Sequence, residues 1–316
     1  MIDGVLVIDK PAGMTSHDVV SRVRRRLHTR KVGHAGTLDP DATGVLVLCV
    51  GDATRLIEYA VAAEKEYVGE VVFGQATDTD DASGSVTDVM DATRLEQPAV
   101  EAAAAEFVGG YDQRVPAYSA VHIEGQRAYQ LARRGEVPDL PVRHVDILEF
   151  QVLAFFPGPV ARAVFRVVCS KGTYIRALCR DWGERLGFPA HMGSLRRTRS
   201  GSFSLQDAVS LAAWEELDQP ADALQPMASA VSMLPQVCLA PSLCTRLAHG
   251  QAIAVADTVA VDALAENRGL NLRQDGEVAV FAAGGDLAAV ARLTEREGRP
   301  WLQPRKVFWK KGRACK

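Results

Sequence analysis

The sequence predicts an α+β protein: a mixed, largely antiparallel central sheet flanked by helices, followed by a small C-terminal β-barrel-like domain. The predicted strands and helices do not alternate in the strict βαβ order of a doubly wound sheet. The composition changes near residues 226–240, and the short apolar runs beyond this stretch are broken by glycine, as in small barrels. The 316 residues also suffice for two domains. We expect these domains at residues 1–230 and 231–316, the second ending in a basic tail.

Apolar patterning indicates the elements of the first hundred residues. Residues 4–11 form a short strand that ends at Pro11. Thr15 or Ser16 caps a helix whose apolar positions continue to Leu27. The expected elements that follow are a Gly- and Pro-rich loop over residues 33–44, a buried strand over 44–51, a helix from 54, a strand over 65–74, an acidic loop over 77–84 and a helix over 98–109.

The same periodicities predict the later elements. These are a loop and a short helix over 113–135, strands over 143–155 and 161–169 around a Pro-Gly-Pro turn, an amphipathic helix over 173–187 and a strand-like stretch over 192–204. Residues 226–240 have the composition of a linker. Short apolar runs within 248–257 and 276–293 are then expected to form the barrel-like domain.

The charge distribution indicates a polyanionic partner. The formal net charge is only −3, from 36 Lys and Arg against 39 Asp and Glu, which excludes indiscriminate coating of nucleic acid. The bases are nevertheless concentrated: six without an acid in residues 21–38, nine against two acids in 161–200, and six without an acid in the last sixteen residues. We expect folding to gather these blocks on one basic face, with much of the helix in the acidic segment 64–112 facing away from the substrate.

Several classes of protein are excluded. No segment approaches the ~20 consecutive apolar residues of a membrane span, and the N-terminus lacks the apolar run of a signal peptide. The six cysteines form no CxxC pair and no Cys/His cluster at zinc spacing. We therefore expect reduced thiols, no metal and a cytoplasmic location.

The candidate for chemistry is Asp39, in the loop sequence GHAGTLDPDATG. Pro40 restricts Asp39 to extended backbone geometry, and the flanking glycines allow a large ligand to approach closely. A simple Asp-Pro turn explains the same residues. Asp39 to Thr43 also match the D-x-D-x-T motif of aspartyl-nucleophile phosphatases, although no long buried strand precedes them. No GK[ST] follows the glycines, which excludes a phosphate-binding P-loop.

Longer motifs resemble one family. GHAGTLDPDATGVLVLCVGDATRL and the opening GVLVIDKPAGMTSHDVVSRVRR resemble signatures of the TruB family, tRNA pseudouridine synthases that modify the T-loop uridine. Three further segments resemble the later conserved blocks of this family in the same order: EKEYVGEVVFGQATDTDDASG, VPAYSAVHIEGQRAYQLARRGE and CSKGTYIRALCRDWGERLGFPAHMGSLRRTRSG. The resemblance spans nearly all of residues 4–210. The C-terminal segment is more loosely similar to the PUA-like RNA-binding module of such enzymes.

The resemblance implies an isomerase that converts uridine to pseudouridine at position 55 of tRNA. The base would be flipped out of the T-loop, and its glycosidic bond would be broken and re-formed with the help of an aspartate. No cofactor is needed. The implied partner is the tRNA T-arm, and we expect a monomer that uses no guide RNA. An RNA-binding or tRNA-folding protein with an incidental active site is the alternative from a different class.

The resemblance also assigns roles to individual residues. Asp39 matches the catalytic aspartate, which either attacks the ribose C1′ or acts after glycal formation. Arg176 matches the arginine that pairs with it, in keeping with the fit of a guanidinium to a carboxylate. Tyr67 matches the tyrosine that stacks on the flipped base, and His34 the histidine that fills the space which the base leaves.

Further positions follow from the same motifs. Tyr174 and Leu195 match residues of the uracil pocket. Contacts to RNA phosphates or sugars are expected from Lys10, Lys65, Lys171, Arg196 and Arg197. Val115 and His122 depart from the proline and lysine that the family often has there, so the resemblance implies less about the RNA contacts of this segment.

Overall fold

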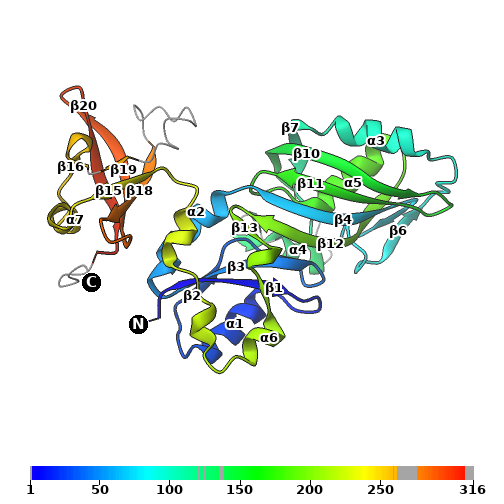
Figure 1. Ribbon diagram of the computed structural model, residues 1–316. Helices are drawn as coiled ribbons and strands as arrows, with labels where there is room; N and C mark the ends of the chain where they lie inside the picture. The colour runs from blue at the N-terminus through cyan, green and yellow to red at the C-terminus, as the bar shows by residue number, and fades with distance from the viewer. Residues whose placement is uncertain are drawn as a thin grey trace.

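The computed structural model describes residues 2–119, 121–123, 125–134, 139–258, 260–261 and 276–309. These residues fold into two units, each built on its own sheet (Figure 1). Most of the expected basic tail, from residue 310 onward, lies outside the described residues.

The larger unit is organised around a mixed sheet. Its strands are β1 (Gly4–Lys10), β2 (Val32–His34), β3 (Thr43–Val50), β4 (Lys65–Phe73), β7 (Gly109–Arg114), β10 (Val142–Phe156), β11 (Ala161–Cys169), β12 (Ala190–Ser200), β13 (Phe203–Ser204) and β14 (Val209–Ser210). In the described residues they run in the order β14-β1-β3-β12-β4-β11-β10-β7, with β2 beside β3 and β13 beside β12. The β1–β14 and β3–β12 pairs are parallel and the other pairs are antiparallel, which confirms the predicted mixed, largely antiparallel sheet.

The longer helices of this unit are α1 (Ser16–Arg26), α3 (Gln97–Ala105) and α5 (Ile175–Leu186), and the short ones are α2 (Ile57–Ala62), α4 (Ala128–Arg133) and α6 (Leu211–Glu215). Side chains of α1, α3, α5 and α6 pack into one apolar cluster with the sheet. Thr15 caps α1 as the sequence predicts, because its Oγ1 accepts a hydrogen bond from the Asp18 amide at 3.1 Å. Within the described part of the chain, none of the helices has the length and hydropathy that a membrane crossing requires.

The helix α5, which begins at the candidate site, is held in place by the packing of Trp182. Trp182 is fully buried, with ring centroids 5.3 Å from Phe73 and 4.7 Å from Phe150 in edge-to-face geometry. Its indole nitrogen donates to the Val100 carbonyl of α3 at 3.2 Å. The first turn of α5 is thereby held in a constant position relative to β4 and β10.

Two small hairpins lie outside the main sheet. The strands β5 (Gln75–Thr77) and β6 (Val86–Val89) carry the acidic loop 77–84 between them. The strands β8 (His122–Ile123) and β9 (Gln126–Arg127) precede α4. The expectation of only a loop and a short helix over 113–135 is therefore incomplete, since two-residue strands leave no periodic signal.

The smaller, C-terminal unit is a curled sheet that forms a half-barrel. Its elements are β15 (Gln236–Leu239), α7 (Pro241–Ala248), β16 (Ile253–Ala254), β17 (Ala260–Val261), β18 (Glu277–Ala282), β19 (Leu287–Arg296) and β20 (Arg299–Val307), and the described strands run in the order β16-β20-β19-β18-β15-β17. The expectation of a linker over 226–240 is wrong for its second half, because Val237 and Leu239 of β15 alternate into the core of this sheet.

An apolar cluster joins the two units. Val5 of β1 and Val45 of β3 belong to the same buried cluster as Val290 of β19 and Phe308. The Arg55 guanidinium lies over the Phe308 ring, 4.7 Å from its centroid. The C-terminal unit thus meets the larger one beside residues 51–58, where Arg55 also donates to the Val307 carbonyl at 2.8 Å and Lys306 pairs with Glu58.

We expect Phe308→Ala to lower the free energy of unfolding by about 3 kcal/mol, because truncating a buried phenylalanine leaves a cavity. Urea denaturation followed by circular dichroism measures this loss. Phe156→Ala makes the same change at a ring that is 48% exposed, and it should cost less than about 1 kcal/mol. Equal stability of Phe308→Ala and the wild type would contradict the packing between the units.

Candidate active site

Asp39 lies in the loop between β2 and β3, against the first turn of α5. Its carboxylate accepts two hydrogen bonds from Arg176: Nε to Oδ2 at 3.0 Å and Nη2 to Oδ1 at 3.3 Å. The Asp39 side chain is 38% exposed, whereas that of Arg176 is 6% exposed. The pair therefore presents a carboxylate to the outside that a fixed guanidinium holds from within.

Arg176 has further partners. Its Nη1 donates to the Thr79 carbonyl and its Nη2 to the Tyr118 carbonyl, both at 2.9 Å. Asp81 Oδ2 lies 3.5 Å from its Nε. A buried charge is tolerated only when it is paired and hydrogen-bonded. Thr79, Asp81 and Tyr118 are therefore structural parts of the site.

Two cavities open beside Asp39, with volumes of about 640 and 280 Å³. Both are lined by Asp39, Tyr118, Ser119, Arg176 and Leu195. The larger cavity extends along residues 39–42, 81–83 and 192–195, and the smaller along 36–39 and 170–176. Asp39 thus stands where the two cavities meet.

The structure brings most of the predicted pocket residues together. Tyr67 of β4, Tyr174 at the start of α5 and Leu195 of β12 line the smaller cavity. Burial raises the pKa of the Tyr67 phenol, which keeps the ring neutral. His34 is not among the described residues that line either cavity. His34 lies on β2. Its Nδ1 atom is buried without a hydrogen-bond partner in the part of the chain that the structure describes, and burial lowers the pKa of the imidazole.

Lys10, expected as an RNA contact, is fully buried. Its ammonium donates to the carbonyls of Pro11, Met14 and Pro40, each at 2.8 Å. Burial lowers the pKa of this lysine, and the negative charges nearby partly offset that effect. We therefore assign Lys10 a structural role, because its three donors are used to hold Pro40 next to Asp39.

Arg197, also expected as an RNA contact, holds the other side of the same loop. It is 1% exposed. Its guanidinium donates to the Gly36 carbonyl at 3.1 Å, the Thr37 carbonyl at 3.4 Å and the Val45 carbonyl at 2.7 Å. This arrangement ties the residues before Asp39 to β3 and leaves the guanidinium buried under the loop.

Lys65 is a third buried member of the expected contact set. It is 6% exposed, and its ammonium donates to the carbonyls of Val61 and Ala63. Burial, together with the neighbouring charge of Arg197, lowers its pKa from 10.5 to about 8. Its side chain lines the smaller cavity beside Tyr67.

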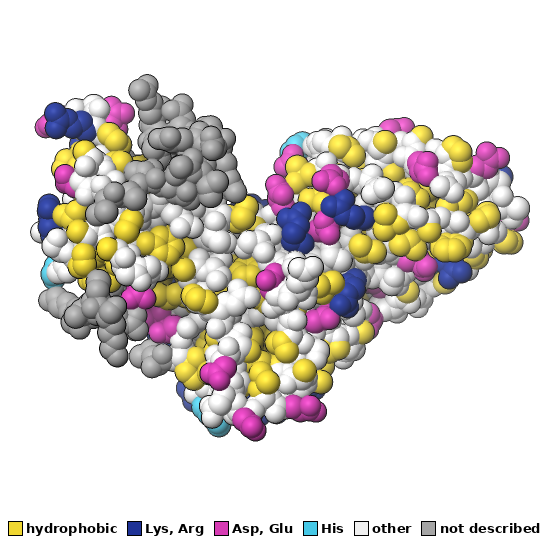
Figure 2. Space-filling model, viewed as in Figure 1, with side chains coloured by type: hydrophobic (Ala, Val, Ile, Leu, Met, Phe, Trp, Pro, Cys, Tyr) yellow, Lys and Arg dark blue, Asp and Glu magenta, His cyan; other side chains and the backbone are white. Residues whose placement is uncertain are grey.

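The remaining two members reach the surface. Lys171 is exposed and lines the smaller cavity, while Arg196 pairs with Asp9 at 2.7 Å. Figure 2 shows a hollow between the C-terminal unit and the far half of the large sheet. In this view, the coloured Lys and Arg side chains lie among Asp and Glu and do not form a continuous basic surface.

Sequence reasoning missed Thr79, Asp81, Tyr118 and Ser119 as residues of the site. Asp81 belongs to the acidic segment 64–112, whose charge suggested distance from a polyanion. A usable signal was the chemistry of Arg176, since a buried guanidinium has five donor hydrogens and one carboxylate cannot satisfy them all. Further acceptors had to come from elsewhere in the chain.

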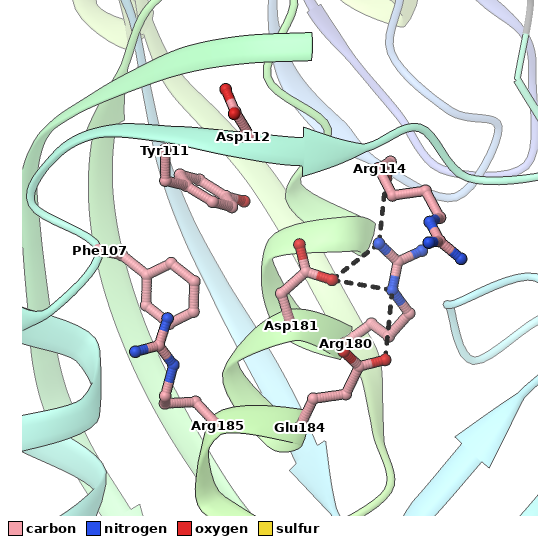
Figure 3. A pocket seen from close by; sticks show the side chains of 8 residues that line it. All are labelled: Phe107, Tyr111, Asp112, Arg114, Arg180, Asp181, Glu184 and Arg185. Atoms are coloured by element: carbon pink, nitrogen blue, oxygen red, sulfur yellow. Dashed lines mark hydrogen bonds and ion pairs between the residues drawn. The ribbon is translucent and has the colours of Figure 1, made fainter. Parts of the chain in front are cut away.

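A third cavity, of about 680 Å³, runs along α5 (Figure 3). Arg180 lies in its wall, where it is bound by Asp181 at 2.9 and 2.7 Å and by the Arg114 carbonyl at 3.0 Å. Arg180 also pairs with Asp80 at 2.9 Å. This arginine therefore connects the helix to the same loop that contacts Arg176.

Comparisons with known proteins agree with one another. The family model "TruB family pseudouridylate synthase (N terminal domain)" matches residues 24–175, and the "tRNA pseudouridylate synthase B C-terminal domain" matches 176–232. A tRNA pseudouridine synthase B of Symbiobacterium thermophilum is 47% identical over 80% of this chain and 84% of its own length. That of Thermobifida fusca is 44% identical over 95% of this chain and 98% of its own length.

Solved structures match over nearly the whole chain. An H/ACA RNP bound to a substrate RNA containing 2′-deoxyuridine is similar with a TM-score of 0.75 and 27% identity, covering 98% of this chain and 86% of that one. A Cbf5-Nop10-Gar1 complex is similar with a TM-score of 0.72 and 29% identity, covering 97% and 85%. The similarity thus covers the C-terminal sheet as well as the part of the chain that contains Asp39 and the two cavities beside it.

We expect Lys10→Met to lower the free energy of unfolding by about 2 kcal/mol or more, because three buried carbonyls lose a charged donor. Thermal or urea denaturation measures this. The control is Lys31→Met, which removes an exposed lysine 3.5 Å from Asp52 and should change stability by no more than about 0.5 kcal/mol. Similar small effects in both variants would contradict the structural role of Lys10.

Lys65 predicts a distinctive pH dependence of stability. Its pKa of about 8 in the folded protein lies below the ordinary 10.5, so between these values the unfolded chain keeps a proton that the folded chain has released. The contribution of Lys65 to the free energy of unfolding therefore rises with pH across this window, by at most about 1.4 kcal/mol per pH unit. Urea denaturation of wild type and Lys65→Met at several pH values isolates the slope.

The exposed Lys171 of the same cavity provides the control for this measurement. Lys171→Met should show the same pH dependence of stability as the wild type. If Lys65→Met also followed the wild-type curve between pH 8 and 10.5, Lys65 would have an ordinary pKa, and the effect assigned to its burial would be wrong.

Proposed function

Because the chain belongs to the TruB family of pseudouridylate synthases, we propose that it converts uridine to pseudouridine in tRNA and that its target is the uridine at position 55 of the T-loop. The curated relatives are named tRNA pseudouridine synthase B. The resemblance of the motifs implies the T-loop as the target. The reaction is an isomerisation, and we place it in the cytoplasm with the tRNA.

Pseudouridine formation replaces one bond of the nucleotide with another. The bond between C1′ and N1 breaks, the uracil turns, and C5 bonds to C1′. C5 loses its hydrogen as a proton and N1 gains a proton, so the reaction balances without an oxidant or a second substrate. The required protein group is an ionised carboxylate at the sugar, which either adds to C1′ or removes a proton along the glycal route.

The observation that carries the proposal is the Asp39–Arg176 pair at the meeting point of two cavities. The guanidinium supplies an opposite charge and two hydrogen bonds, which orient both carboxylate oxygens. The exposed part of Asp39 is left free for a nucleotide. The loop around Asp39 is held by buried side chains, as the positioning of a reactive group requires.

The smaller cavity offers the contacts that a flipped base needs. The target base is stacked within the T-loop and must leave it before it can reach a carboxylate. We propose that the Tyr67 ring stacks on the flipped uracil, with Leu195 and Tyr174 as the remaining walls. Lys171, exposed at this cavity, would contact a nearby phosphate.

We further propose that residues 1–230 perform the catalysis, that residues 231–316 add RNA contacts, and that the chain acts without a guide RNA. The curated relatives match the chain over most of their length and are named for tRNA. The solved H/ACA RNP and the Cbf5-Nop10-Gar1 complex are less similar in sequence. Asp39 also lies in a loop that follows the three-residue strand β2, so the phosphatase-like motif lacks the long buried strand that it needs.

The test is incubation of the purified protein with an unmodified tRNA transcript, followed by chemical mapping of pseudouridine. We expect product in the T-loop without any added RNA or cofactor. Asp39→Asn removes the carboxylate charge and should lower the rate by roughly 1,000-fold or more. The Kd for tRNA should change by less than about 3-fold, because phosphate contacts elsewhere supply most of the affinity.

Asp52→Asn is the matched control, since it removes a carboxylate that pairs with Lys31 and lines neither of the two cavities. It should react at the wild-type rate. Product at another uridine would contradict the T-loop assignment, and conversion only after a guide RNA is added would contradict independent action. Tight tRNA binding without any product would favour the alternative of an RNA-binding or tRNA-folding protein.

A further inference from the structure

Two arginines of α5 face the same loop. Arg176 and Arg180 are four residues apart, so they project from one side of the helix in successive turns. Arg176 Nη1 donates to the Thr79 carbonyl at 2.9 Å, and Arg180 Nη1 donates to Asp80 Oδ2 at 2.9 Å. Two successive turns of one helix are thus bound to two successive residues of the loop.

The backbone of Asp80 directs consecutive carboxylates to different arginines. Asp80 has a φ of 60°, in the left-handed region that residues with side chains seldom adopt. Its carbonyl accepts from the Met192 amide at 3.0 Å. Asp80 then pairs with Arg180, while the following Asp81 lies 3.5 Å from Arg176. Such a conformation persists only where surrounding contacts maintain it.

Arg180 is itself immobilised. Its side chain is 19% exposed, and Asp181 accepts from both its Nε and its Nη2 (Figure 3). Nη2 also donates to the Arg114 carbonyl at 3.0 Å, and Glu184 lies 4.0 Å from Nε. The guanidinium of Arg180 is therefore held by Asp181 of α5 and Arg114 of β7 independently of the loop. It provides Asp80 with an ion-pair partner in a fixed position.

We infer that Asp80 and Arg180 are positioning residues for the reaction, because their ion pair holds residues 79–81 where Thr79 and Asp81 fix Arg176 against Asp39. This role rests on the proposed function of the site. Buried ion pairs contribute little net stability compared with apolar contacts, so a gain in stability alone does not explain the pair. A misplacement of about 1 Å at a reacting group lowers rates by about 100-fold, which gives the pair an effect on catalysis without contact to the substrate.

Asp80→Asn is the informative variant. Asparagine has the same shape and tolerates the left-handed backbone, and Arg180 keeps its bonds to Asp181 and Arg114. The measurement is the single-turnover rate constant with enzyme in excess over tRNA labelled with tritium at uridine C5, since C5 loses its hydrogen when it bonds to the sugar. We expect this rate constant to fall about 10-fold or more, while the Kd for tRNA changes by less than about 2-fold.

Variants of Arg180 extend the test. Arg180→Gln should lower the rate constant at least as much as Asp80→Asn. Arg180→Lys, which keeps the charge but not the fork, should retain an intermediate rate. The double variant Asp80→Asn with Arg180→Gln should react no more slowly than Arg180→Gln alone, because both changes remove one interaction.

The same helix offers a matched control. Glu106 pairs with Arg185 of α5 at 2.7 Å on the surface, so Glu106→Gln also replaces a carboxylate that is bound to an α5 arginine. It should leave the rate constant unchanged. Wild-type protein that releases no tritium would overturn the proposed function and this inference together. Active wild type with an equal rate constant in Asp80→Asn would overturn the inference alone.

Discussion

The candidate site depends on hydrogen bonds between buried side chains and the loop of Asp39. Arg197 binds the carbonyls of Gly36 and Thr37, Ser16 binds both backbone groups of Leu38, and Lys10 binds the carbonyl of Pro40. Buried backbone groups outside a sheet need partners of this kind. Buried cations need acceptors just as strictly. The loop backbone and the buried side chains therefore satisfy each other's need for hydrogen-bond partners. As a result, a loop of turn-forming residues is held rigid.

The partner of Asp39 is fixed from a different direction. Arg176 lies in the first turn of a helix that Trp182 anchors in the core, and its guanidinium is bound by Asp39, Asp81 and two backbone carbonyls. Three distant parts of the chain, at residues 39, 79–81 and 118, therefore meet at one guanidinium of α5. This convergence explains how a half-exposed carboxylate keeps one orientation beside open cavities.

Opposite charge blocks of the sequence neutralise each other in the fold. Neighbouring strands β4 and β11, and the contact of α5 with α3 and the acidic loop, bring the basic block 161–200 against the acidic block 64–112. The resulting pairs include Arg162–Glu70, Arg166–Glu66, Arg199–Glu66, Arg176–Asp81, Arg180–Asp80 and Arg185–Glu106. A count of charges along the chain therefore overestimates the basic surface that is free to meet RNA.

The sequence by itself determined the fold class and the order of the main strands and helices, and it singled out Asp39, Tyr67 and Arg176 as site candidates, because periodicity and motifs are local properties. Only the tertiary structure decided that Lys10, Lys65 and Arg197 are buried, that His34 is not among the described residues lining the two cavities beside Asp39, and that Thr79, Asp81 and Tyr118 surround Arg176. The reason is physical: the sequence shows the same lysine or arginine whether the side chain is buried or exposed, and its role depends on which carbonyls or carboxylates from distant segments reach it. Strand pairing and helix packing bring those segments together, and no local pattern records them.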